Sequence, residues 1–167
     1  MYVYVLLLVF PAIMAFAAAM DLLTMRIPNR ISIALAVAFF VAAPFAGLSL
    51  HDVLSHAAAG AVVLAAAIGL FAFGGFGGGD GKLLAAAALW IGFEGLVMFL
   101  AFVAVAGGVL AVAILFYRRV PAIEALPVPE WALKLHERGT GIPYGIAIAA
   151  GALLIYPHTA WFAALAS

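Results

Sequence analysis

Two acidic residues stand at the edges of long apolar runs, where a carboxyl group is costly to place. Asp21 follows an apolar run that starts at the amino end, and Asp80 lies in a glycine-rich segment before another apolar run. Acids at membrane depth usually face a bundle interior or a cavity and mark function. Two carboxyls that share one site cannot both ionise, so one activates water while the other protonates a substrate carbonyl. Asp21 and Asp80 are therefore a candidate catalytic pair, with two solvated, silent headgroup acids as the simpler alternative.

The composition is that of an integral membrane protein. Of the 167 residues, 69% are apolar and 8% are charged, whereas ordinary globular chains are about 45–50% apolar and about 25% charged. Seven basic and seven acidic side chains cannot cover the surface of a soluble domain of this size. The zero net charge argues against nucleic acid as a partner, and the absence of cysteine excludes disulfides, thiolate nucleophiles and cysteine-ligated metals.

Six apolar runs predict transmembrane helices, since a tilted helix needs about 20 residues to cross about 30 Å of hydrocarbon. The runs cover residues 2–21, 30–48, 55–73, 81–93, 95–117 and 142–160. The first run ends in small residues, as a cleavable signal does, but no basic residue precedes it, so we expect a retained span. The prediction is an all-α polytopic membrane protein with six transmembrane helices in a single domain, residues 1–167.

The charged residues segregate in this six-helix arrangement. All seven basic residues fall on one side: Arg26, Arg30, Lys82, Arg118, Arg119, Lys134 and Arg138. The opposite side carries Asp52, Glu94 and the histidines His51, His56 and His158. The positive-inside rule then places the basic loops in the cytoplasm and both termini in the periplasm. Asp21 closes the first helix and Asp80 opens the fourth, so both carboxyls are expected on the cytoplasmic side.

The fourth run is short, and an irregular glycine-rich segment precedes it. Only thirteen residues separate Asp80 from Glu94, which reach about 20 Å at about 1.5 Å per residue. Irregular backbone at membrane depth is tolerated only where it lines a cavity, so we expect Asp80 to lie in one. The segment fits neither a Walker loop nor a dinucleotide fingerprint. Close helix packing through Gly75 and Gly79 is the structural alternative.

Two further parts of the sequence carry less specific predictions: the connector before the last apolar run, and the polar residues of the opposite side. Pro129 can start a short helix in the connector before the last run, with Trp131 and Leu135 on one side, lying in the cytoplasmic interface. Asp52 and His56 have a spacing that suits metal ligands on one helix face, but a wet turn at the outer surface is the preferred interpretation. Glu94 is placed in an outer turn, with a proton-relay role as the alternative.

The residues around the two acids resemble the type IV prepilin peptidases. The segment from Asp21 to Ile27-Pro28-Asn29 resembles their first-aspartate motif, and Gly77-Gly78-Gly79-Asp80 fits their Gly-x-Gly-Asp motif, which presenilin-type proteases share. Lys82-Leu83-Leu84-Ala85 and Leu89-Trp90-Ile91-Gly92 resemble the continuation of the family pattern, and Ile142-Pro143-Tyr144-Gly145 resembles its Pro-Phe-Gly. The resemblance spans nearly the whole chain.

This resemblance implies an intramembrane aspartyl endopeptidase. It would cleave the short basic leader of prepilins or pseudopilins at the cytoplasmic face of the bacterial inner membrane, without metal or other cofactor. Asp21 and Asp80 would be catalytic, with a supporting motif of Ile27, Pro28, Asn29, Gly77, Gly79 and Lys82. The partners implied are the prepilin, membrane lipid and the pilus assembly machinery.

Larger members of that family insert a methyltransferase domain with paired Cys-x-x-Cys motifs after the first helix. This chain has only a short link there and no cysteine. It is similar to the short, peptidase-only members associated with tight-adherence (Flp-type) pili, so no N-methyltransferase activity is expected. The remaining alternative is a non-enzymatic membrane component, such as a small proton-coupled transporter or an assembly subunit that uses the same acids as a relay.

Overall fold

The computed structural model describes residues 2–121, 127–137, 139–159 and 161–162, and within these residues it contains helices and no strand. The α-helices are α1 (Tyr2–Thr24), α2 (Asn29–Ala42), α3 (Leu50–Ala72), α4 (Gly78–Tyr117), α5 (Glu130–His136) and α6 (Tyr144–Ile155), with short 3-10 helices η1 (Ala43–Ala46) and η3 (Tyr156–His158). Among the described residues, four helical segments are long and apolar enough to cross a membrane: α1, α2 together with η1, α3 and α4. The predicted all-helical membrane architecture is confirmed, while the count of six spans stays a prediction.

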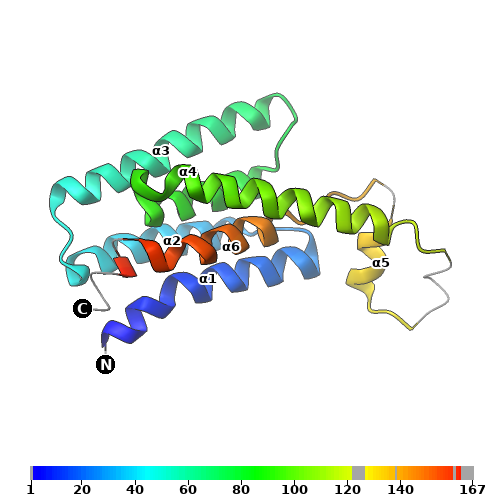
Figure 1. Ribbon diagram of the computed structural model, residues 1–167, viewed down its shortest axis with the longest axis horizontal. Coiled ribbons are helices and arrows are strands. Elements are labelled where there is room, and N and C mark those ends of the chain that lie inside the picture. The colour runs from blue at the N-terminus through cyan, green and yellow to red at the C-terminus, as the bar shows by residue number, and fades with distance from the viewer. Residues whose placement is uncertain (1, 122–126, 138, 160, 163–167) are drawn as a thin grey trace.

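The long helix α4 is broken at Gly92, whose backbone has φ 73° and ψ 176°. The part before the break runs along α3 in the opposite direction. Gly81 packs against Ala67 near the end of α3, and Gly92 packs against the ring of His56 near its start. At this end of the molecule the chain changes direction, as Figure 1 shows for the two green stretches of α4.

The part of α4 after the break runs back along α6. Near the break, Gly95 approaches Ile155 at the end of α6, and further along, Gly107 packs against Tyr144 at the start of α6. Residues Gly78–Ile91 and Phe93–Tyr117 therefore form two antiparallel helical arms. These arms correspond to the two predicted runs 81–93 and 95–117.

The turn between the arms differs in detail from the prediction. It falls at Gly92 rather than at Glu94, and the first arm begins at Gly78, three residues earlier than the predicted run. The reason is backbone geometry: a positive φ with an extended ψ is open to glycine and strained for any residue with a Cβ. The turn is therefore set by the backbone freedom of Gly92 and not by the charge of Glu94.

Replacing Gly92 with alanine should destabilise the protein. A Cβ at this position would lie 2.8 Å from Cε1 of His56, in addition to the backbone strain, and such strain alone costs about 1–3 kcal/mol. Gly108→Ala in the second arm is the matched control, because a Cβ there meets nothing within 4 Å. Thermal unfolding of the two variants in detergent should show a lower midpoint for Gly92→Ala only. Equal midpoints would contradict the proposed strain.

His56 supports the turn from the neighbouring helix. The break at Gly92 interrupts the helical pairing of the carbonyls that precede it, and Nδ1 of His56 lies 2.8 Å from one of them, the carbonyl oxygen of Leu89. The imidazole is buried and stacks on Phe39 with a ring-centroid distance of 5.5 Å. The sequence-based placement of His56 in a wet outer turn is therefore wrong. The helix α3 begins at Leu50, five residues before the predicted run, so His56 lies in its second turn, where packing against Phe39 and Leu89 buries the ring.

An aromatic cluster holds the helices together near the end where α4 breaks. Fully buried rings from α1, α2, α4 and the carboxyl-terminal end meet there: Phe10, Phe39, Trp90 and Trp161. The indole N–H of Trp90 donates a hydrogen bond of 2.8 Å to the carbonyl of Leu35, which fixes α4 against α2. Buried aromatic pairs of this kind dominate core packing.

The short helix predicted after Pro129 is present as α5. Leu135 is buried, Trp131 is half-buried, and the helix packs on the end of α4. Arg118 donates hydrogen bonds to the carbonyls of Leu135 at 2.8 Å and of Thr140 at 2.6 Å. These bonds tie the connector to the end of the second arm. Arg138, which was also assigned to this connector, lies outside the described residues.

Candidate active site

Asp21 lies in the last turn of α1. Its carbonyl accepts a hydrogen bond of 2.8 Å from the N–H of Met25, which has a positive φ of 55° and ends the helix. The link from Arg26 to Pro28 follows, and α2 begins directly after Pro28, whose φ of −61° suits a helix start. The tight link keeps the carboxyl of Asp21 beside the first turn of α2.

Asp80 lies in the first turn of α4, three residues after the N-cap Gly77. Its carboxyl turns back over that glycine, because a Cβ on Gly77 would lie 2.5 Å from Oδ2 of Asp80. The first turn of a helix carries the positive end of the dipole, which favours a carboxylate there. Any larger residue at position 77 would displace the carboxyl.

One cleft of about 640 Å³ contains both carboxyls. Its lining comes from the link between α1 and α2, from the start of α4 and from the segment before α6: Asp21, Met25, Arg26, Ile27, Pro28, Asn29, Gly77, Gly79, Asp80, Thr140, Gly141 and Ile142. Asp21 is 4% exposed and Asp80 is half-buried. The expected juxtaposition of the two acids, and of Asp80 with a cavity, is present.

The start of α6 contributes a contact to which the sequence assigned no role. The N–H of Gly145 donates a hydrogen bond of 2.7 Å to Oδ2 of Asp21. A backbone donor to a carboxylate is a strong, charge-assisted bond, and it fixes the direction of the side chain. Gly145 belongs to the Pro-Tyr-Gly segment that carries part of the resemblance. The contact shows what this segment does in the structure: it places a backbone donor on the carboxyl of Asp21.

Ile27 fills the space between three of these elements. Its side chain is buried, with Cδ1 2.8 Å from where a Cβ of Gly145 would lie, and its carbonyl oxygen is 3.3 Å from where a Cβ of Gly79 would lie. The glycines at positions 79 and 145 thus let α4 and α6 close around Ile27. The apolar residue of the Ile-Pro-Asn segment is therefore a packing residue at the floor of the cleft.

Asn29 and Lys82 form a bridge at the rim of the cleft. Nζ of Lys82 donates a hydrogen bond of 2.9 Å to Oδ1 of Asn29, and both side chains are exposed. The bridge connects the first residue of α2 to the second turn of α4. Of the predicted supporting residues, Ile27, Pro28, Asn29, Gly77 and Gly79 line the cleft, and Lys82 lies beside it.

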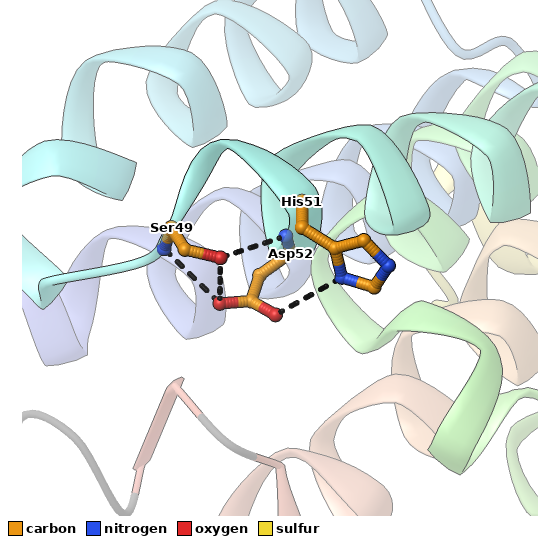
Figure 2. A network of polar contacts seen from close by, with 3 residues as sticks. All are labelled: Ser49, His51 and Asp52. Atoms are coloured by element: carbon orange, nitrogen blue, oxygen red, sulfur yellow. Dashed lines mark hydrogen bonds and ion pairs between the residues drawn. The ribbon is translucent and has the colours of Figure 1, made fainter.

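The alternative metal site at the other end of the molecule does not assemble. Figure 2 shows Asp52 engaged with Ser49: Oδ2 accepts from the Ser49 hydroxyl at 2.7 Å and from its N–H at 3.0 Å, which caps α3. His56 points to Leu89 instead. Among the described residues no group of three or more His, Asp or Glu side chains is placed to hold a metal ion.

The alternative explanation for the glycine-rich segment was close helix packing through Gly75 and Gly79. The structure shows such packing for Gly79 but not for Gly75. Gly75 lies outside any helix, where its N–H donates to the carbonyl of Leu70. Gly79 lies in α4 and faces Ile27. The two glycines therefore do not form one small-residue face on a helix, and the close approach that exists serves the cleft.

Comparison with known protein families gives one match. A model described as the type IV leader peptidase family matches residues 8–112, which include Asp21 and Asp80 and both arms of α4 as far as Val112. No curated protein and no solved structure matches the chain. Because the match covers more than half of the chain and agrees with the motifs and the cleft, the chain belongs to the type IV leader peptidase family.

Proposed function

We propose that this protein is an aspartyl endopeptidase that cleaves the short basic leader of Flp-type prepilins or pseudopilins at the cytoplasmic face of the bacterial inner membrane. The observation that carries the proposal is the shared cleft: Asp21 of α1 and Asp80 of α4 are 59 positions apart in the sequence and line one hollow. The family match supports a peptidase with a prepilin-type substrate.

The cleft provides the groups that peptide hydrolysis needs. The ionised carboxyl of the pair removes a proton from water, and the water oxygen attacks the scissile carbonyl carbon. The protonated carboxyl donates its proton to the carbonyl oxygen, and collapse of the tetrahedral intermediate releases the amine with a proton from the pair. The Gly145 N–H keeps one oxygen of Asp21 in a defined direction during these steps.

The proposed membrane orientation rests on the separation of charges between the two ends. Arg26 lines the cleft and Lys82 lies at its rim, whereas Glu94 and His158 line a cavity of about 720 Å³ at the end where α4 breaks. With the cleft end in the cytoplasm, the two arms of α4 each cross the bilayer, and the positive-inside rule is obeyed.

Reporter fusions should read out this orientation. We expect a periplasmic signal from fusions after Ser167 and within residues 48–55, and a cytoplasmic signal from a fusion near Pro127. A cytoplasmic signal from the carboxyl end would contradict six crossings. A periplasmic signal near Pro127 would place the cleft on the wrong side for a cytoplasmic leader.

Cleavage in detergent separates the proposal from a transporter or an assembly subunit. The purified chain is mixed in detergent with prepilins of its host that were produced in its absence, and the pilin mass is then measured intact. A peptidase shortens the prepilin without any membrane potential, whereas a proton-coupled transporter needs sealed vesicles. An unchanged prepilin mass with every candidate substrate would refute the proposed activity.

A further inference from the structure

One wall of the catalytic cleft has no regular secondary structure. Thr140, Gly141 and Ile142 line the cleft from the link between α5 and α6, and all three lie outside any helix. Among the described residues, the backbone N–H groups of this wall make one hydrogen bond, a long one of 3.4 Å from Thr140 to the carbonyl of Glu137. A segment with so few backbone bonds does not hold a single shape by itself.

Arg118, the residue that follows α4, binds the carbonyls of this wall. Nη2 of its guanidinium donates to the carbonyl oxygen of Thr140 at 2.6 Å and to that of Gly141 at 3.1 Å. Nε of the same group donates to the carbonyl oxygen of Leu135 at 2.8 Å. Because the guanidinium is planar and its donors point in fixed directions, these bonds join the wall to the last turn of α5 and to the end of α4.

Arg118 is itself held in place. Its backbone N–H donates to the carbonyl of Ile114 at 2.9 Å, which closes the last turn of α4, and its side chain is half-buried. A cation at this position also suits the negative end of the helix dipole. The hydroxyl of Tyr117 donates to the carbonyl of Ala132 at 3.1 Å, which fixes α5 beside the end of α4, as Figure 1 shows. The guanidinium therefore reaches the wall from a fixed position.

The other end of the wall is anchored without Arg118. Pro143 follows Ile142 and is fully buried, and α6 begins directly after it. From there α6 packs along α1 and α4, and its Gly145 donates the hydrogen bond to Asp21. The wall is thus a short link between the guanidinium and a buried proline. Loss of the guanidinium would loosen the wall but leave the catalytic carboxyl in place.

We propose that Arg118 is a positioning residue, which holds residues 140–142 as a preformed wall against which the substrate peptide lies. The inference rests on the proposed peptidase function. Arg118 does not line the cleft, so it acts on the peptide only through the wall. A wall that is ordered before the peptide arrives improves binding, because the cost in entropy of ordering it is not taken from the binding free energy.

Arg118→Met tests this role by steady-state kinetics in detergent on a full-length prepilin. Methionine has no donor, so three carbonyls lose their partner. We expect KM to rise about tenfold, the cost of ordering roughly one backbone residue on binding. The value of kcat should stay within about twofold of wild type, as it does when only binding is lost.

Two further variants separate the hydrogen bonds of Arg118 from its charge. Arg118→Lys keeps the charge but lacks the planar fork of donors, so its KM should stay above that of wild type. Arg119→Met removes the neighbouring cation, which is exposed and lies over the ring of Phe116 at 5.4 Å. It is the matched control and should have the KM and kcat of wild type.

Hydrogen exchange measures the order of the wall without any activity. The amides of residues 139–142 should exchange faster in Arg118→Met than in wild type, while those of α6 should exchange at the same rate. Equal exchange of the wall, an unchanged KM for Arg118→Met, or a wild-type KM for Arg118→Lys would overturn the proposal. The same rise in KM for Arg119→Met, or a fall in kcat without a rise in KM, would also overturn it. If wild type cleaves no prepilin, the peptidase function is refuted, and the binding role of Arg118 with it, whatever the exchange rates.

Discussion

Asp21→Asn and Asp80→Asn should each abolish prepilin cleavage. Asparagine keeps the size of the side chain but neither removes a proton from water nor donates one as a carboxyl does. General acid–base groups contribute about 10²- to 10⁴-fold, and here one pair supplies both roles. We expect a loss of at least about a thousandfold for each variant and no further loss for the double variant, since residues that act as a unit are not additive.

Asp52→Asn is the matched control for these two variants. It makes the same chemical change to an acid at the opposite end of the molecule, where Asp52 caps α3 through Ser49. Cleavage by this variant should stay close to wild type. Initial rates with purified, folded variants and the mass of the processed pilin are the measurements. Normal processing by Asp21→Asn or Asp80→Asn would refute the paired mechanism.

The helical architecture was predictable because the composition leaves few alternatives. An apolar chain with a handful of charges must form helices in a membrane, since each backbone N–H and C=O needs a partner there. The segregation of basic residues also predicted which helix ends lie together, and Arg26, Lys82 and Arg118 do lie at the cleft end. The turn of α4 was harder to place, because the polar residue that interrupts the apolar run is Glu94, whereas the backbone turns two residues earlier at Gly92.

The candidate pair, Asp21 and Asp80, could be singled out in the sequence, but its surroundings could not. Asp21 and Asp80 are acids at the ends of apolar runs, and such residues are few in this sequence. The hydrogen bond from the N–H of Gly145 to Asp21 joins residues 124 positions apart, so no local sequence pattern predicts it. The only signal was the Pro-Tyr-Gly segment before the last helix. The prediction for His56 was wrong because a histidine near the start of a helix is expected to be solvated, whereas tertiary packing buries this one.

Gly145→Ala should nearly inactivate the enzyme while leaving it folded. A Cβ at this position would lie 2.8 Å from Oδ2 of Asp21 and 2.8 Å from Cδ1 of Ile27, closer than either contact allows. The carboxyl must then move, or α6 must shift away from α1. A displacement of about 1 Å at a catalytic group costs about a hundredfold in rate. We expect kcat to fall by that factor, with KM near the wild-type value because the cleft walls that hold the peptide remain.

Gly141→Ala is the control for this variant, since Gly141 lines the same cleft and a Cβ there meets nothing within 4 Å. Its kcat should match wild type. Steady-state kinetics on a prepilin, together with thermal unfolding in detergent, separate displacement of Asp21 from general destabilisation. Full activity of Gly145→Ala would show that the backbone bond to Asp21 has no role in catalysis. A raised KM with unchanged kcat would place Gly145 in substrate binding, because only a shift of the catalytic carboxyl lowers the rate of the bound complex.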